Sequence, residues 1–314
     1  MGSGYQYENC HDGQTFWHRT PQSGINPFRC DSKPMRVTLT GAAGRLGSHV
    51  CRTLVECLHT VCATDKAFRA DLPARIEVAN LLEPAGCYRL LDGSEALVHL
   101  ANHPTFRAND AQRLFNENVA MNMNVFQAAA DLGVKRIVFA SSVQVISGPS
   151  QADEPSAVSS LPYLPLDGNV PPNPGNPYAL SKHLSEIMLA YFARRAGMSC
   201  VAIRFPALVD DEFLTKMATR PSQHVHGRNE GFSFLHFLDA ASLVAATLCA
   251  PLNGFRVYFP AARENRLGQP VADTVRQHFP STPLRQPPGE MTSLVDVSSI
   301  ERETGWSPKF GTPR

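Results

Sequence analysis

Two side chains at helical spacing give the clearest sign of chemistry in this sequence. Tyr178 and Lys182 are four residues apart, so on a helix the phenol and the ammonium group share one face. A tyrosine is a poor base at its usual pKa of about 10. A neighbouring lysine charge favours the phenolate and moves that pKa toward neutrality. The pair therefore predicts proton transfer to or from a hydroxyl or carbonyl oxygen.

A serine upstream adds to this prediction. Ser142 follows the apolar run 136–140, and its hydroxyl can bond to the substrate oxygen that Tyr178 serves. The alternative is a surface pair, because the Y-x-x-x-K spacing often arises by chance. The motif gains weight from its order along the chain, since it follows a glycine turn, an acid after the second strand, and Ser142.

The glycine turn comes directly after the apolar run 35–40. Its glycines are spaced G-x-x-G-x-x-G at Gly41, Gly44 and Gly47, at the start of an amphipathic helix over about 44–58. Gly41 lets the chain turn sharply, Gly44 leaves room for a pyrophosphate, and Gly47 lets the helix pack closely. The N–H groups of that helix terminus favour phosphate. Alone, the motif fits a purely structural turn equally well.

Alternating strands and helices predict an α/β fold with a Rossmann-like, doubly wound parallel sheet. The strands are near-continuous apolar runs, as in sheets covered on both faces. Polar residues follow four of them, where open α/β sheets bind ligands: Asp65, Asn80, Asn102 and Ser142. The expected strands are 35–40, 60–64, 75–79, 96–100, 136–140 and 200–204, and the expected long helices include 110–132 and 178–196.

The alternation also suggests how the chain divides. Residues 35–204 are expected to form a dinucleotide-binding domain, to which 234–250 returns. Residues 205–233 and 251–314 are expected to form a small C-terminal substrate lobe, because the alternation loosens there. Residues 1–34 have no periodic apolar pattern and are expected to be a flexible extension outside the fold.

Asp65 lies about 20 residues after the glycine turn, where a dinucleotide fold places an acid that accepts from the ribose hydroxyls. An acid there disfavours a 2′-phosphate, so the sequence favours NAD over NADP. Three nearby cations weaken this inference, because any of them could hold the phosphate: Arg45, Lys66 and Arg69. Asp65 as a plain turn cap is the alternative.

Composition excludes several other classes of function. The formal net charge of +1 gives no reason to expect nucleic acid or an anionic membrane as partner. No apolar run is long enough to span a bilayer, and no signal peptide is recognisable. The eight scattered cysteines predict small buried side chains in a reducing cytosol, hence a cytoplasmic protein. No compact metal-ligand spacing is present, so no metal is expected.

Taken together, these motifs resemble the extended short-chain dehydrogenase/reductase family, the NAD-dependent sugar epimerases and dehydratases. The resemblance runs from about Met35 to Pro308. It rests on the segments 40–47, 98–101, 118–119, 139–142, 176–182, 234–239, 293–296 and 305–308.

The resemblance implies a role for each matching residue. Tyr178 would be the catalytic acid or base, and Ser142 would orient the reacting oxygen. Lys182 would hold the nicotinamide ribose and, together with the oxidised nicotinamide, lower the pKa of Tyr178. The cofactor would be NAD. Its implied binding residues are Gly41, Gly44, Arg45, Leu46, Gly47 and Asp65 for the adenosine diphosphate half, Asn80 and Leu81 beside the adenine, Leu100, Ala101 and Asn118 along the rest, Phe205 and Pro206 at the nicotinamide, and the catalytic Tyr178 and Lys182.

Two departures from the family pattern bear on the substrate. Arg204 is followed by Phe205, where relatives that bind sugar nucleotides usually carry an asparagine, and the segment before Asp239 is short. Uronate and aldose dehydrogenases of the family are compact in the same way. Val143 and Gln144 stand where the dehydratases carry an Asp-Glu pair, so dehydration is not expected.

We therefore expect an epimerase-like oxidoreductase acting on a sugar or sugar nucleotide. The alternative is an NAD-dependent sugar or uronate 1-dehydrogenase, which uses the same residues. A non-catalytic nucleotide-binding regulatory protein ranks below both, because such proteins typically lose the Tyr or the Lys. The resemblance also implies a homodimer through the helices at 110–132 and 177–196.

Overall fold

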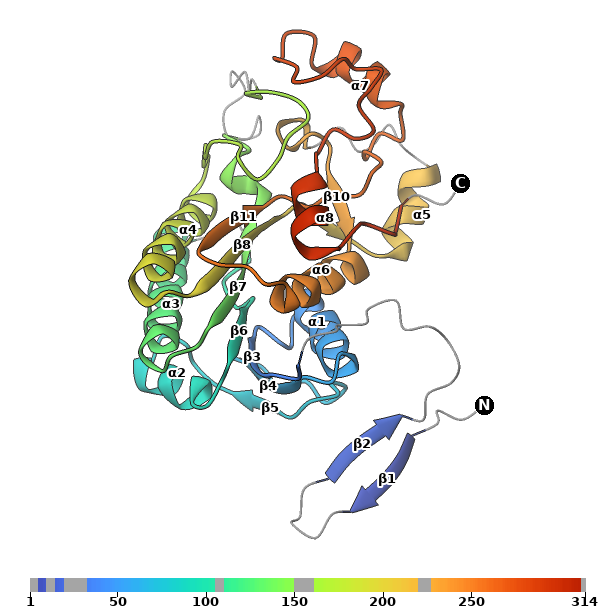
Figure 1. Ribbon diagram of the computed structural model, residues 1–314. Helices are drawn as coiled ribbons and strands as arrows, with labels where there is room; N and C mark the ends of the chain where they lie inside the picture. Colours follow the sequence, from blue (N-terminus) through green and yellow to red (C-terminus); the bar gives the residue numbers. More distant parts are fainter. Residues whose placement is uncertain are drawn as a thin grey trace.

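The computed structural model describes residues 5–9, 15–19, 33–104, 110–149, 161–219 and 227–311 (Figure 1). Its centre is a seven-stranded sheet with the strand order β11-β8-β7-β6-β3-β4-β5, in which all six neighbouring pairs are parallel. This confirms the predicted Rossmann-like sheet. The strands are β3 (Arg36–Thr40), β4 (Thr60–Asp65), β5 (Ile76–Val78), β6 (Ala96–His99), β7 (Arg136–Ser142), β8 (Ser199–Phe205) and β11 (Phe255–Tyr258).

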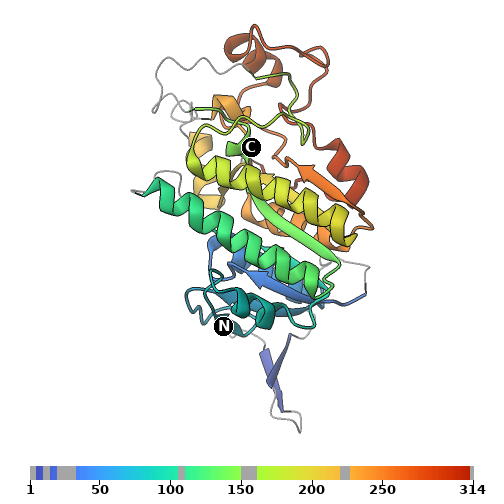
Figure 2. The same cartoon turned by 90° about the vertical axis from the view of Figure 1, so that its left-hand side faces the viewer.

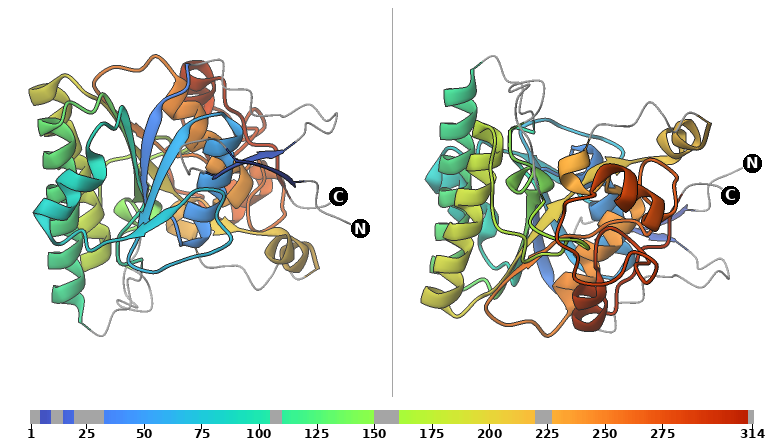
Figure 3. Two further views of the ribbon diagram at one scale, coloured as in Figure 1. Left: turned by 90° about the horizontal axis from the view of Figure 1, so that it is seen from below. Right: turned by 90° about the horizontal axis from the view of Figure 1, so that it is seen from above.

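Helices cover both faces of this sheet (Figure 3). On one face, α1 (Arg45–Glu56) packs against α6 (Phe237–Cys249). On the other lie α2 (Pro84–Leu91), α3 (Ala111–Asp131) and α4 (Pro177–Ala196), with α3 and α4 side by side (Figure 2). Successive strand residues point to opposite faces, so Val98 packs into the core beside α1 and α6, whereas Leu97 packs into the core beside α3 and α4.

The C-terminal part is built from short elements. β9 (Ala207–Val209) and β10 (Phe234–His236) form a small parallel sheet. Isolated bridges tie Leu164 to Leu284 and Leu166 to Val295. The remaining elements are α5 (Asp211–Thr219), α7 (Val271–His278), α8 (Ser298–Thr304) and the 3-10 turns η1 (Val143–Val145) and η3 (Arg228–Glu230).

The predicted domain boundary crosses the central sheet. β11 falls inside 251–314, the range expected for the substrate lobe, yet it pairs with β8 from Phe255–Cys200 to Tyr258–Ile203. This strand was not expected from the sequence, because four residues with an arginine among them carry little periodic signal. The division into a cofactor domain and a substrate lobe stays a prediction.

The N-terminal extension contains an element that was not predicted. β1 (Tyr5–Asn9) and β2 (Thr15–Arg19) form an antiparallel two-stranded sheet separate from the central one. The predicted flexibility concerns residues 1–34, most of which lie outside the described ranges. In the described part of the chain, Cys51, Cys62, Cys87 and Cys200 are free thiols. Cys249 is disulfide-bonded, contrary to the prediction that the cysteines are buried thiols. No helix in the described part of the chain is long and apolar enough to cross a membrane.

Candidate active site

The glycine turn joins β3 to α1 at the carboxyl edge of the sheet. Gly41 has a φ of +74°, and a Cβ there would lie 2.7 Å from the backbone nitrogen of Ala101. A Cβ on Gly47 would lie 2.0 Å from the carbonyl oxygen of Gly41, whereas one on Gly44 would lie 3.2 Å from it. Gly41 therefore serves the sharp turn, and Gly47 lets α1 begin against that turn.

The start of α1 is suited to bind an anion. Its N-cap is Gly44, and no side chain caps the helix. The first N–H groups of a helix have no partner within it, and the helix dipole favours negative charge there. Asp65, at the end of β4, accepts a 3.0 Å hydrogen bond from the backbone N–H of Ala43 in the same turn. An acid and an uncapped helix start thus meet at one edge.

Several predicted cofactor residues are already held by protein groups. Arg45 pairs with Asp210 at 2.6 Å and lies over the ring of Phe237, 4.6 Å from its centroid. The side chain of Asn118 is fully buried, and its oxygen accepts from the backbone of His103 at 2.8 Å. Both contacts fix neighbouring loops, so the two residues shape the site through those loops.

The remaining predicted residues line the same end of the sheet or lie near it. The side-chain oxygen of Asn80 accepts from the backbone N–H of Leu82 at 3.1 Å, in a tight turn after β5. Leu81 is buried. Leu100 and Ala101 follow β6 directly, and Phe205 ends β8 as a buried ring with Pro206 next to it. Within the described residues, no hydrogen bond joins Asn80 to Ser142, Tyr178 or Lys182.

The start of α4 is fixed next to Ser142. Asn176 caps the helix by accepting from the backbone N–H of Ala179 at 2.9 Å, and its amide donates to the Gln144 side chain at 3.1 Å. Gln144 in turn donates its backbone N–H to the Ser142 hydroxyl at 3.2 Å. These contacts bring Tyr178, two residues after the cap, close to Ser142, whose hydroxyl acts on the pKa of the phenol.

Lys182 lies one turn further along α4 and is fully enclosed. Its ammonium group donates to the Asn102 side-chain oxygen and to the carbonyl oxygen of Ala140, both at 2.7 Å. It lies 5.7 Å from the centroid of the Tyr178 ring. Burial lowers the pKa of Lys182 to about 7, while the carboxylate of Glu186 opposes this shift. A substantial share of the amine is therefore neutral near pH 7.

Without a cofactor, the pKa of Tyr178 moves in the direction opposite to the one expected when Lys182 and an oxidised nicotinamide act on it together. Burial raises the pKa of Tyr178 to about 12, and the hydrogen bond from Ser142 only partly opposes the rise. Two physical reasons account for this. The phenolate loses its hydration in the site, and the lysine that was expected to stabilise it is itself only partly charged. The phenol is thus a protonated donor in this structure.

The comparisons with known proteins agree with this geometry. A family model described as the NAD dependent epimerase/dehydratase family matches residues 37–244. The chain belongs to this family. The match spans the glycine turn, Asp65, Ser142 and the Tyr178–Lys182 pair.

Individual relatives of this epimerase/dehydratase chain include both predicted kinds of enzyme. It is 31% identical over 176 residues to a uronate dehydrogenase of Pseudomonas syringae pv. tomato, covering 54% of this chain and 58% of that protein. It is 25% identical over 187 residues to a UDP-glucose 4-epimerase of Lactobacillus helveticus, covering 54% and 51%. The alignments thus span somewhat over half of these relatives.

Solved structures show the same fold. A UDP-glucose 4-epimerase of Thermotoga maritima with UDP-glucose aligns with a TM-score of 0.65 at 18% identity, covering 88% of this chain and 94% of that one. One of Thermus thermophilus in complex with NAD aligns with a TM-score of 0.62 at 22% identity, covering 88% and 95%. At these identities the likeness establishes the fold alone.

The structure also holds a series of hydrogen-bonded polar side chains that was not expected to be part of the site. Asn102 donates to the side-chain oxygen of Asn122 at 2.7 Å, and His99 contacts that oxygen at 2.8 Å. The other ring nitrogen of His99 lies 2.6 Å from the hydroxyl of Thr40, next to Gly41. This series of hydrogen-bonded side chains therefore runs from the glycine turn to Lys182. Its signals in the sequence were Asn102 at a strand end and His99 within the segment 98–101.

His99 should make the stability of the protein depend on pH. Burial lowers its pKa to about 3, from 6.5 in an unfolded chain. Between these values the unfolded chain binds a proton that the folded one does not, so the free energy of unfolding falls as the pH falls, by about 1.4 kcal/mol per pH unit from this group. Above pH 6.5 the group has no such effect.

Chemical denaturation at several pH values between 7 and 4 checks this. The wild type should lose stability more steeply on acidification than His99→Gln, whose side chain does not titrate. Parallel curves for the two proteins would mean that His99 is not held neutral.

Proposed function

We propose that this protein is an NAD-dependent oxidoreductase that acts on a hydroxyl of a sugar or sugar nucleotide, in an epimerase-like reaction. The observation that carries the proposal is the contact between Tyr178 and Ser142 at the end of β7, with Lys182 one helical turn away. When bound, a nicotinamide dinucleotide accepts a hydride from the alcohol carbon. The chain's own task is to take up and return the hydroxyl proton.

The roles of the three catalytic residues follow from their contacts. Ser142 donates toward the phenol oxygen, so a substrate oxygen between them is held by two hydroxyl groups. Tyr178 exchanges the proton with that oxygen. The Nζ of Lys182 lies 5.7 Å from the centroid of the Tyr178 ring and is held there by Asn102 and Ala140. We assign Asn102 as a positioning residue, because it reaches the chemistry only through Lys182.

The residues at the glycine turn fit a dinucleotide. Gly41 and Gly47 are required by the backbone itself, but a Cβ on Gly44 would meet only one atom, at 3.2 Å. A glycine there is best explained by a ligand that needs the space. The uncapped start of α1 supplies donors for a pyrophosphate, and Asp65 supplies an acceptor for ribose hydroxyls. Selection of NAD over NADP is part of the proposal.

A sugar or uronate 1-dehydrogenase is the second candidate. Two observations favour it: the missing asparagine after Arg204, and the 31% identity to a uronate dehydrogenase. Arg204 is buried in a pair with Glu186 at 2.8 Å, so it holds α4 against β8 and is not available to a substrate. An epimerase would keep the reduced cofactor bound and return the hydride to the opposite face of the sugar, whereas a dehydrogenase would release NADH.

The test is the nucleotide content of the purified protein, followed by a panel of UDP-hexoses, free sugars and uronates. NAD that stays bound through gel filtration, with interconversion of UDP-hexoses, supports the epimerase-like reaction. A protein that reduces added NAD with a free sugar or uronate is the dehydrogenase. A protein that neither retains nor binds NAD or NADH contradicts both.

We further propose a homodimer through α3 and α4. These helices lie side by side (Figure 2), and they carry large apolar side chains that are 40–53% exposed: Met123, Leu180, Ile187 and Tyr191. Ile187→Glu should convert a dimer to a monomer, because it places a charge in the apolar contact. Light scattering after gel filtration measures the oligomeric state. Leu58→Glu is the matched control, because Leu58 is exposed and lies outside α3 and α4.

An unchanged dimer in Ile187→Glu, or a monomeric wild type, would contradict this interface. We also propose a cytosolic location. The free thiols of Cys51, Cys62 and Cys87 support it, and the disulfide-bonded Cys249 counts against it. Cell fractionation tests it.

A further inference from the structure

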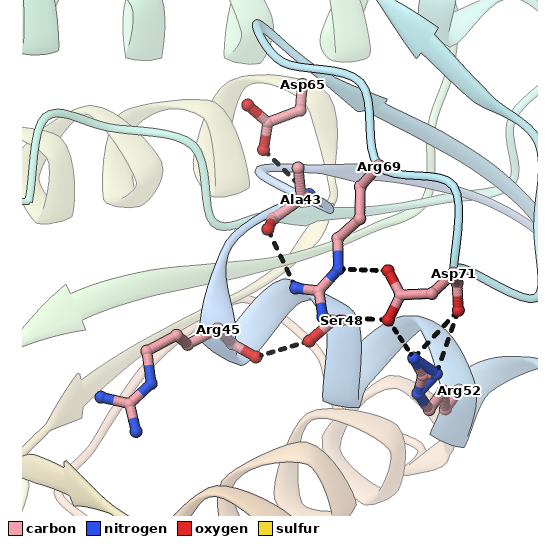
Figure 4. A network of polar contacts seen from close by, with 7 residues as sticks. All are labelled: Ala43, Arg45, Ser48, Arg52, Asp65, Arg69 and Asp71. Carbon is pink, nitrogen blue, oxygen red and sulfur yellow. Dashed lines mark hydrogen bonds and ion pairs between the residues drawn. The ribbon is translucent and has the colours of Figure 1, made fainter.

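Arg69 lies beside the turn that would hold the adenosine ribose (Figure 4). One of its guanidinium nitrogens donates to the carbonyl oxygen of Ala43 at 3.1 Å. The backbone N–H of the same Ala43 donates to Asp65 at 3.0 Å. The carboxylate of Asp65 and the guanidinium of Arg69 therefore bracket one residue of the glycine turn. A group bound next to Asp65 lies within reach of this arginine.

The charge of Arg69 is matched by Asp71. The guanidinium makes a two-point contact, with Nε 2.7 Å from one carboxylate oxygen and Nη2 3.1 Å from the other. Two-point pairing fixes both the position and the orientation of an arginine. The pairing raises the pKa of Arg69 and, together with Arg52, holds the pKa of Asp71 well below its usual range. Asp71 therefore stays ionised at any working pH.

A second arginine holds Asp71 in place. Arg52 on α1 donates to the Asp71 carboxylate at 2.9 Å and to its backbone carbonyl oxygen at 2.9 Å (Figure 4). The loop after β4 is thus tied to α1 and to the glycine turn at once. Arg45, another cation near the turn, points away from this group and pairs with Asp210.

This arrangement bears on which dinucleotide the site accepts. The 2′-phosphate of NADP carries close to two negative charges, and guanidinium groups bind phosphate well. We propose that Asp71 is a specificity-determining residue: it neutralises Arg69, so that the site selects the 2′-hydroxyl of NAD over the 2′-phosphate of NADP. The inference rests on the proposed use of a nicotinamide dinucleotide and deepens it. Asp65 repels the phosphate directly, and Asp71 withholds the cation that would offset this repulsion.

The test is a binding measurement that needs no substrate. NADH and NADPH are titrated into the purified protein and binding is followed by the fluorescence of the reduced nicotinamide. Asp71→Asn keeps the side-chain shape and removes the charge. It should tighten NADPH binding by about fivefold and leave NADH binding within about twofold, since one exposed ion pair is released. Asp71→Ser should act in the same direction.

Two further variants separate charge from loosening of the loop. Asp71→Asn/Arg69→Gln should lose the gain in NADPH binding, because the released arginine is gone. Arg52→Gln frees the loop from α1 and leaves Asp71 to Arg69 alone, so NADPH binding should not become stronger relative to NADH binding.

Each result decides a separate question. An Asp71→Asn protein with the wild-type affinity ratio, or a double variant that keeps the gain, overturns this inference while NADH binding still supports the proposed function. A wild type that binds NADPH as tightly as NADH also overturns it. A wild type that binds neither overturns the proposed function, and this inference with it.

Discussion

Tyr178→Phe is expected to lower turnover by about 1,000-fold while NADH binding stays within about twofold of the wild type. The ring remains in its place on α4, and only the hydroxyl that contacts Ser142 is lost. Positioned proton transfer contributes on the order of 100- to 10,000-fold to a rate, and no other phenol in the site can supply it. The measurement is the rate of nicotinamide reduction or sugar interconversion on the substrate that the panel identifies.

Tyr191→Phe is the matched control for this variant. It removes a hydroxyl from the same helix, three turns away and 46% exposed, so activity should stay at the wild-type level. A Tyr178→Phe protein that keeps more than a tenth of the wild-type rate would exclude the phenol as the proton carrier. If no sugar is turned over and the two proteins behave alike, a non-catalytic nucleotide-binding protein becomes the better account.

The raised pKa of the phenol makes the lysine more important to this prediction. A phenol with a pKa of about 12 is almost entirely protonated near neutrality, so little phenolate is present to accept the substrate proton, and oxidation needs positive charge near it. Lys182 can supply that charge only in its protonated form, and its own pKa is lowered to about 7. Asn102 and Ala140 both accept from the ammonium group and hold it in the site. The fraction of Lys182 that carries the charge needed near the phenol therefore depends on these two acceptors.

Much of this site could be predicted because it depends on local signals. A glycine after an apolar strand, an acid at the end of the next strand and a Tyr–Lys pair at helical spacing each carry their meaning within a few residues. The parallel sheet then brings strand ends to one edge whatever the loops do. This is why Asp65 and Ser142 were expected at the same edge, from positions 77 residues apart in the sequence.

What could not be predicted depends on burial and long-range contact. The pKa values of Tyr178 and Lys182 follow from how completely the fold encloses them, which no spacing reveals. Asn102 matters because it meets Lys182 from 80 residues away. β11 has four residues, so it can be recognised as a strand only from its pairing with β8. In each case the decisive partner lies far along the chain.

Gly47→Ala is the second large effect that we expect. A Cβ at this position would lie 2.0 Å from the carbonyl oxygen of Gly41 and 2.8 Å from the Cα of Ala42. Both are backbone atoms, so the turn or the helix has to shift. Overpacking of this kind costs about 1–3 kcal/mol of stability. Because the shift moves the N–H groups at the start of α1, NADH affinity should fall by at least about tenfold.

Gly86→Ala is the matched control, because it makes the same change in a helix where the new Cβ has no close contact with another backbone atom. Gly86 lies in α2, and the nearest atom to a Cβ there is the Asn80 carbonyl oxygen at 3.8 Å, an ordinary contact. Alanine is the better helix former by about 1 kcal/mol, so this variant should be as stable as the wild type or more stable, and bind NADH equally well. Thermal unfolding and NADH titration are measured on both variants. If Gly47→Ala binds NADH like Gly86→Ala, the start of α1 does not hold the cofactor, and the glycine turn is only a structural feature.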